Sequence, residues 1–159
     1  YSESLPCCIS FQFLWVFCTN LALYSFYLHL FTCCSLLKQN AMVIFKKFTF
    51  DSAHALPHVP EGHKCKNVHG HTYLLTVYVE GVLDPKLGWI MDFGDLKDVI
   101  EPLVKQIDHK FLNDIEGLEN PTCEILAVWI WDRLVNEISG LKRIELNETP
   151  TSGAIYEGE

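Results

Sequence analysis

The sequence predicts an α+β domain built on an antiparallel sheet, and the periodicity of its apolar residues is the basis of this prediction. Near both ends of residues 42–159, apolar and polar residues alternate as in a half-buried strand, whereas in the middle apolar residues recur every three to four positions, as on one face of a helix. The order strand, strand, helix, helix, strand, strand contains no strand–helix–strand repeat, so we expect four antiparallel strands with both helices on one face. The expected strands are 43–50, 69–82, 143–149 and 154–156, and the expected helices are 96–107 and 121–138.

Residues typical of helix ends bound the two predicted helices. Either Asp92 or Asp95 can cap the first one, because a carboxylate accepts hydrogen bonds from the free N–H groups of the first turn. Pro102 lies inside that helix and should kink or shorten it. For the second helix, Asn120 is the expected cap and Pro121 the first helical residue.

Residues 1–41 differ in composition from the rest of the chain. They contain one acid and one base, Glu3 and Lys38, together with five of the seven cysteines, and 27 of them are Phe, Leu, Ser, Tyr, Cys or Trp. These residue types have codons that begin with T, so we expect the segment to be translated upstream sequence or a non-native extension. The alternative is a membrane or targeting segment, since residues 9–37 carry no charge and are long enough to span a bilayer. The functional domain is then expected at residues 42–159.

The charge of this domain limits its partners. Residues 42–159 carry 11 basic and 19 acidic residues, which account for the net charge of −8, and no Lys/Arg cluster that could neutralise a phosphate backbone. We therefore expect neither a nucleic-acid nor a membrane partner. Two cysteines remain, Cys65 and Cys123, too few for a disulfide framework, which favours the reducing cytoplasm. Cys123 is expected to be a small buried residue near a helix start.

Two histidines separated by one glycine, His69 and His71, form the first candidate site. Alternate residues of a strand point to the same face, so both imidazoles project together. His54 follows the first strand and would lie beside His69 if the two strands pair as a hairpin. Three histidines with an open fourth position are typical of catalytic zinc. The alternative is a pair of surface histidines on a strand.

A thiol and a carboxylate–imidazole pair are the next candidates. Cys65 lies between Lys64 and Lys66, whose charges favour the thiolate, so it could be a zinc ligand, a catalytic base or a nucleophile. The alternative is an unreactive loop thiol. Asp108 is followed by His109 at the end of the first helix, and such a pair suits general acid–base catalysis. Alternatively, His109 only favours the negative end of the helix dipole.

Glu148 is a carboxylate in an apolar environment. Period two places it on the same face as Ile144 and Leu146, where a charge needs a hydrogen-bond donor. A planar heterocycle with two N–H groups would match its two oxygens. The alternative is an arginine of the chain, Arg133 or Arg143.

Several segments in register resemble the 6-pyruvoyl-tetrahydropterin synthase superfamily, over essentially residues 43–159. They are, in chain order, Phe48-Thr49-Phe50-Asp51-Ser52-Ala53-His54, Leu56-Pro57-His58, Gly62-His63-Lys64-Cys65, His69-Gly70-His71, Trp89-Ile90-Met91-Asp92-Phe93, Asp108-His109 with Leu112-Asn113, Glu119-Asn120-Pro121-Thr122 with Glu124, and Glu148-Thr149 followed by Gly153. Three residues separate Cys65 from His69, and this spacing resembles the branch of bacterial 6-carboxy-5,6,7,8-tetrahydropterin synthases. Animal-type 6-pyruvoyl synthases have a longer spacing.

The resemblance implies a carbon–carbon lyase with a homo-oligomeric tunnelling fold (T-fold), a trimer or hexamer whose active sites lie at subunit interfaces. The exposed edges of a four-stranded sheet independently favour pairing with a neighbouring subunit. The implied substrate is 7,8-dihydroneopterin triphosphate, and the implied products belong to queuosine and 7-deazapurine biosynthesis. The implied roles are zinc ligation by His54, His69 and His71, general-base catalysis by Cys65, assistance of proton transfer by Asp108 and His109, and anchoring of the pterin by Glu148.

Overall fold

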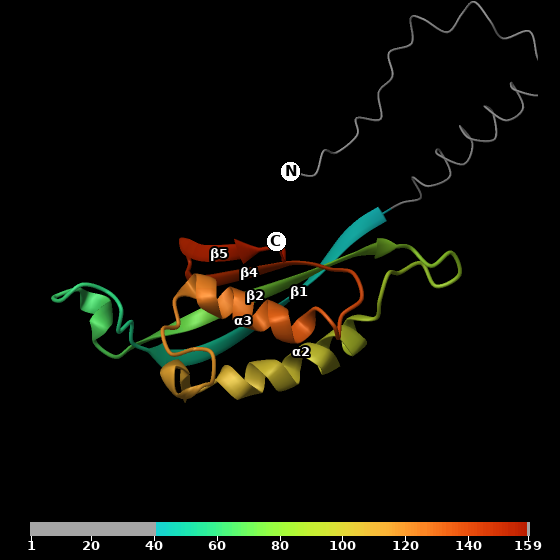
Figure 1. Cartoon of the computed structure of the whole chain (residues 1–159). Helices are drawn as coiled ribbons and strands as arrows, with labels where there is room; N and C mark the ends of the chain where they lie inside the picture. Colours follow the sequence, from blue (N-terminus) through green and yellow to red (C-terminus); the bar gives the residue numbers. More distant parts are fainter. Residues whose placement is uncertain (1–40, 159) are drawn as a thin grey trace, which may run out of the picture. The chain divides into compact units, whose positions relative to one another are not determined.

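The computed structural model describes residues 41–158, so the segment 1–41 lies outside the described residues except for Ala41. Within them the chain forms one five-stranded sheet, in the order β3-β1-β2-β4-β5, and two α-helices (Figure 1). The elements are β1 Ala41–His54, η1 Lys64–Lys66, β2 His69–Val82, α2 Phe93–Ile107, β3 Lys110–Phe111, η2 Leu112–Asp114, α3 Cys123–Leu134, β4 Leu141–Thr149 and β5 Ser152–Tyr156, where η marks a 3₁₀-helix. The predicted α+β class and the order of its elements are confirmed.

The sheet contains the four expected antiparallel strands and one short addition. β1 pairs with β2 over its whole length, β2 pairs with β4, and β4 pairs with β5, all antiparallel. β3 joins the free edge of β1 in parallel, opposite Ser52 and Ala53. A strand of two residues is too short to show alternation, so the sequence does not predict it.

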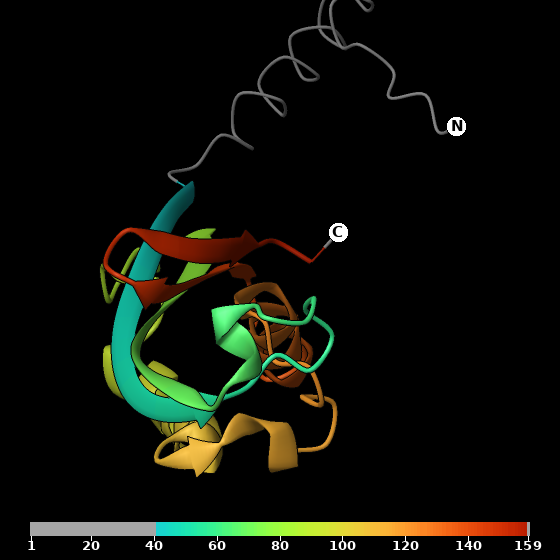
Figure 2. The same ribbon diagram turned by 90° about the vertical axis from the view of Figure 1, so that its left-hand side faces the viewer.

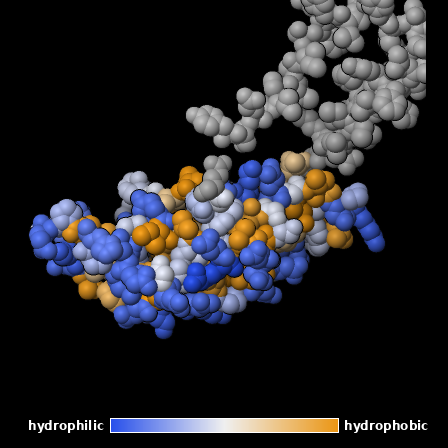
Figure 3. Space-filling model, viewed as in Figure 1, coloured by the Kyte–Doolittle hydropathy of each residue, from blue (hydrophilic) through white to orange (hydrophobic). Residues whose placement is uncertain are grey.

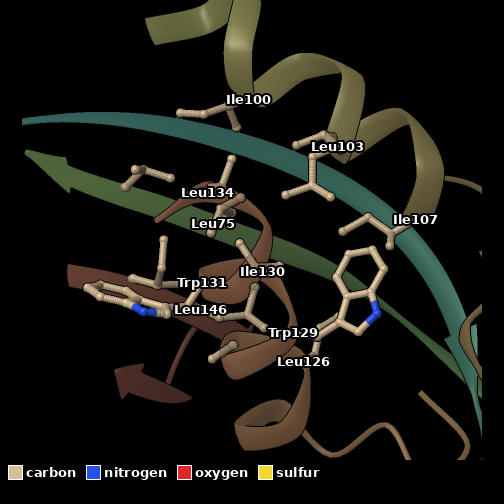
Figure 4. Packing of buried hydrophobic residues seen from close by; sticks show 14 of the residues in the cluster. Leu75, Ile100, Leu103, Ile107, Leu126, Trp129, Ile130, Trp131, Leu134 and Leu146 are labelled. Carbon is tan, nitrogen blue, oxygen red and sulfur yellow. The ribbon is translucent and has the colours of Figure 1, made fainter. Parts of the chain in front are cut away.

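Both helices cover the same face of the sheet, and the core lies between this helix layer and the sheet (Figures 1 and 2). α2 packs against β1, while α3 packs against β4 and β5. The close view of the core shows apolar side chains of both helices meeting those of the strands (Figure 4). Its labelled members are Leu75, Ile100, Leu103, Ile107, Leu126, Trp129, Ile130, Trp131, Leu134 and Leu146.

The helix ends follow the sequence prediction only in part. Asp92 caps α2 by accepting a hydrogen bond from the N–H of Gly94 at 2.6 Å. α2 continues through Pro102 to Ile107, since its buried stripe extends to both sides of the proline and stabilises the second half. α3 is capped by Thr122 rather than Asn120. Pro121 therefore lies before the helix, and its carbonyl remains available for another partner.

The face drawn in Figure 3 mixes charged and apolar side chains. Exposed apolar residues occur on β1 and on the segment between β2 and α2, including Phe45, Leu87 and Trp89. None of the helices within residues 41–158 is long and apolar enough to cross a membrane.

The core makes a direct prediction about stability. Leu75 of β2 is fully buried, whereas Leu87 is 57% exposed. Leu75→Ala removes buried apolar surface and leaves a cavity, so it should lower the free energy of unfolding by about 2–5 kcal/mol. Leu87→Ala, the same chemical change on the surface, should alter it by less than about 0.5 kcal/mol. Urea denaturation of both variants measures the difference, and equal effects would contradict the described core.

Candidate active site

The pairing of β1 with β2 brings three histidines together. His54, the last residue of β1, is the direct partner of His69, the first residue of β2, and His71 follows on the same face. The Nε2 atoms of His54 and His69 lie 3.1 Å apart, and the ligand atoms of all three histidines lie within 4.8 Å of one another. We call these three residues the histidine cluster.

Hydrogen bonds to backbone carbonyls fix the tautomers of two members of the cluster. His54 Nδ1 lies 2.8 Å from the carbonyl oxygen of Pro121, and His69 Nδ1 lies 2.8 Å from that of Asn67. A carbonyl only accepts, so each Nδ1 carries a proton, and in the neutral form of each ring the lone pair is on Nε2. Burial lowers the pKa of His54 and keeps its ring neutral.

The cluster fits a metal ion. Two Nε2 lone pairs that face each other at 3.1 Å repel unless a cation lies between them. Neutral imidazoles whose second nitrogen donates to a carbonyl are also the usual form of histidine metal ligands. Three imidazole nitrogens would leave one position open for a substrate oxygen, as in catalytic zinc sites.

Glu148 of β4 faces the same cluster. Its Oε1 lies 3.3 Å from His54 Nε2 and 3.6 Å from His71 Nε2. The buried hydroxyl of Tyr73 lies 3.4 Å from His54 Nδ1 and also hydrogen-bonds the carboxylate of Glu148. Burial first, and Glu148 second, raise the pKa of Tyr73, so the phenol stays protonated and remains a donor. Sequence reasoning missed Tyr73, although period two from His69 and His71 places it on their face.

The arginines considered as partners of Glu148 lie elsewhere. The guanidinium of Arg133 stacks on the Trp129 ring at 3.6 Å from its centroid. Arg143 forms an ion pair with Glu157 at 2.6 Å. Within residues 41–158, the contacts of the Glu148 carboxylate thus come from the histidine cluster and Tyr73 and not from an arginine.

Asp108 and His109 form a fixed pair between α2 and β3. Asp108 Oδ1 lies 2.9 Å from His109 Nδ1 and accepts a hydrogen bond from the backbone N–H of Asp51 at 3.0 Å. The Asp51 N–H, followed by His109, lowers the pKa of Asp108. His109 has a φ of 56°, in the left-handed region that non-glycine residues rarely adopt. Its ring is 76% exposed, with Nδ1 held by Asp108 and Nε2 directed away from that contact.

The Asp108–His109 pair lies beside the edge of β1, and the histidine cluster lies at the paired ends of β1 and β2. Alternation along β1 turns His54 toward the helices and Asp51 toward the opposite face. Asp51 accepts a hydrogen bond from Thr72 at 2.5 Å, and both residues line an open cavity of about 520 Å³ together with His109 and with His71 of the histidine cluster. One member of the cluster and the imidazole of His109 thus border the same open space.

Cys65 lies on the loop between β1 and β2, in η1. Its thiol is half-buried and free. It is not among the ligand atoms that lie within 4.8 Å of one another in the described part of the chain. The structure thus brings together the three histidines and Glu148, and it places Cys65 and His109 on separate elements around them.

Comparison with known proteins identifies the class to which this fold and site belong. The chain belongs to the 6-pyruvoyl tetrahydropterin synthase family, whose model matches residues 43–159. It is therefore an enzyme, a lyase of the tetrahydropterin synthase type, as the resemblance implied.

Individual relatives carry more specific names. The chain is 44% identical over 120 residues to a 6-carboxy-5,6,7,8-tetrahydropterin synthase of Synechocystis, covering 72% of this chain and 92% of that protein. It is 40% identical to a dihydroneopterin monophosphate aldolase of Pyrococcus furiosus, covering 68% and 90%, and 38% identical to human 6-pyruvoyl tetrahydrobiopterin synthase, covering 60% and 72%. Among solved structures, 6-pyruvoyl tetrahydropterin synthase of Caenorhabditis elegans superposes with a TM-score of 0.71 at 26% identity, covering 76% of this chain and 98% of that one.

The histidine cluster makes a prediction about metal content. His69→Ala or His71→Ala removes one of three ligand nitrogens and should weaken binding of a divalent metal by at least about 10–100-fold, the loss that even outer-shell changes cause. His58→Ala, an exposed loop histidine outside the cluster, is the matched control and should keep the metal. Elemental analysis after dialysis against a competing chelator measures this. Equal metal content in all three variants would show that the cluster does not hold the metal.

The environment of Cys123 predicts how the reactivity of its thiol depends on pH. Burial first, and the Glu148 carboxylate second, raise the pKa of its thiol to about 11. At pH 8 the thiolate fraction is then about 0.1%, so iodoacetamide should modify Cys123 about 100-fold more slowly than an ordinary free cysteine. The rate should rise about tenfold per pH unit up to about pH 11, because only the thiolate reacts. Peptide mass spectrometry follows this residue alone, and a plateau near pH 9 would contradict the prediction.

Proposed function

We propose that this chain catalyses the 6-carboxy-5,6,7,8-tetrahydropterin synthase reaction with zinc bound to the histidine cluster. It would convert 7,8-dihydroneopterin triphosphate and one water molecule to 6-carboxytetrahydropterin, acetaldehyde and triphosphate. The observation that carries the proposal is the 44% identity to the Synechocystis enzyme over nearly the whole of that protein. The cluster of neutral histidine nitrogens with one open position supports it, since the substrate side chain offers hydroxyl oxygens to such a site.

In this proposal the ligands of the metal are His54, His69 and His71. When bound, zinc would polarise the hydroxyls of the substrate side chain as a Lewis acid and make their protons easier to remove. The carbonyls of Pro121 and Asn67 hold the rings of His54 and His69 in the required tautomer. The chain's own residues thus prepare the site before substrate arrives.

Proton transfer is assigned to Cys65 and to the Asp108–His109 pair. Cys65 acts as the thiolate general base on the substrate side chain, with the charges of Lys64 and Lys66 as sequence neighbours. Asp108 keeps the proton of His109 on Nδ1, so Nε2 is the atom that exchanges protons with substrate. Proton transfer at the side chain then precedes a retro-aldol-type cleavage of the carbon–carbon bond and loss of triphosphate.

Glu148 is assigned to the pterin ring, and this role requires the side chain to turn. A bicyclic ring cannot lie between the carboxylate and a metal held by the cluster while Oε1 stays 3.3 Å from His54 Nε2. Glu148 is 26% exposed, so rotation of its side chain is not blocked by burial on every side. In the turned state its two oxygens would accept hydrogen bonds from two N–H groups of the pterin.

The proposal also includes a homo-oligomer, a trimer or hexamer. The ring of His109 is 76% exposed beside the short edge strand β3, where a neighbouring copy can pack. A neighbouring copy that presents its His109 to the histidine cluster would complete the catalytic set at the interface between the two. We further propose that the domain is residues 42–159, that it acts in the cytoplasm in queuosine or 7-deazapurine biosynthesis, and that residues 1–41 take no part in the reaction.

A second candidate is 6-pyruvoyl-tetrahydropterin synthase, which eliminates triphosphate and keeps the carbon–carbon bond. It is favoured by the family match and by the human relative at 38% identity. The alternative that involves no catalysis is a pterin-binding oligomer stabilised by zinc. The Cys65 thiol and the Asp108–His109 pair argue against it, since binding alone needs neither.

Product analysis separates these possibilities. The wild-type protein with zinc should release acetaldehyde from 7,8-dihydroneopterin triphosphate in a one-to-one ratio with 6-carboxytetrahydropterin. Cys65→Ala should lower kcat by about 10²–10⁴-fold, because it removes the general base, while zinc content and pterin binding are kept. Cys123→Ser is the matched control and should retain turnover. A 6-pyruvoyl product without acetaldehyde would overturn the proposed reaction, and undiminished turnover of Cys65→Ala would overturn the role of the thiol.

A further inference from the structure

The short helix that carries Cys65 has no hydrophobic anchor. η1 consists of Lys64, Cys65 and Lys66, and none of the three is buried. Its ends are held by hydrogen bonds, and the ammonium of Lys66 pairs with Glu61. A turn without a fully buried residue depends on its few polar contacts to keep its conformation, because little core packing supports it.

Two of these polar contacts hold the backbone of Cys65 itself. Its N–H donates to Nδ1 of His63 at 3.2 Å, and its carbonyl accepts from the N–H of Leu56 at 2.8 Å. His63 is the N-cap residue of η1, and its imidazole takes the place that Ser, Asp or Asn usually occupies. Since Nδ1 accepts a hydrogen bond, it carries no proton, and the ring is the neutral Nε2–H tautomer.

We propose that His63 is a positioning residue that sets the place of the Cys65 thiol through this cap; the inference rests on the role of Cys65 in the proposed function. The backbone contacts of His63 also support this positioning role. Its N–H donates to Pro60, and its carbonyl accepts from Lys66, so one residue joins the turn before η1 to the end of η1. Without the imidazole acceptor, the N–H of Cys65 turns to water and the thiol loses its fixed position.

The choice of an imidazole also has a physical reason. A carboxylate cap would hold the turn equally well but would place a negative charge beside a thiol that has to ionise. A neutral imidazole accepts the same hydrogen bond without that charge. Replacement of His63 by Asn should therefore preserve the position of the Cys65 thiol. Replacement by Asp should also preserve that position but disfavour the thiolate form of Cys65.

The experiment compares His63→Ala, His63→Asn and His63→Asp in the full chain with zinc, with His58→Ala as a matched loop-histidine control. His63→Ala should lower kcat about tenfold with KM and zinc content changed by less than about twofold, since the metal and pterin sites are untouched. His63→Asn should return kcat to within about twofold of wild type. At pH 7 the kcat of His63→Asp should be well below that of His63→Asn. The kcat of His58→Ala should equal that of the wild-type protein.

A second readout is independent of turnover. Peptide mass spectrometry gives the rate at which iodoacetamide modifies Cys65. This rate should differ from the wild-type rate in His63→Ala, equal it in His63→Asn and fall below it in His63→Asp. If wild type shows no lyase activity, the proposed function fails, and this series still decides the role of His63. If His63→Ala kept both the kcat and the Cys65 reactivity of the wild-type protein, the proposal would be overturned. It would also be overturned if His63→Asn stayed as slow as His63→Ala while zinc and Tm were intact, because His63 would then act on the proton and not on the position of Cys65.

Discussion

The antiparallel register between β1 and β2 is the constraint on which the rest of the molecule depends. It places His54 opposite His69 at one end and Ala41 opposite Val82 at the other. Because side chains alternate between faces, a slip of one residue would turn His54 away from His69 and His71. The stacked rings of Phe50 and Tyr73, 4.9 Å apart and fully buried or nearly so, fix this register in the core. The metal-type site is therefore a consequence of core packing.

The helices act on the site through their ends. α3 begins at Cys123 behind a Thr122 cap, so the carbonyl of Pro121 has no helical partner and accepts the Nδ1–H of His54. α2 ends at Ile107, and the turn that follows places Asp108 on the backbone N–H of Asp51. The layer that buries the core thus also orients the imidazoles, which explains how a small domain can hold several polar groups in fixed directions.

The sequence predicts those features that depend on local periodicity. Alternation and the spacing of His69 and His71 are local, and they predict the strands, the shared face and the hairpin partner His54. The Pro121 carbonyl, the Tyr73 hydroxyl and β3 are not predicted, because each acquires its role through a contact between segments far apart in the chain. The prediction of Asn120 as the cap of α3 is wrong, since Thr122 can equally accept the hydrogen bonds of a first turn and does so.

The exposure of the polar groups at the edge of the sheet is the feature with the widest consequence. The histidine cluster is set by strand register and is only partly buried, with His71 21% and Glu148 26% exposed. His109 is held by Asp108 and Asp51 at an exposed edge, beside the cavity that His71 also lines. The ring of His109 is 76% exposed, so in the proposed oligomer it can be presented to the histidine cluster of a second copy. Assembly is then part of the proposed mechanism, because a partly open cluster and an exposed imidazole are groups that a neighbouring subunit can enclose.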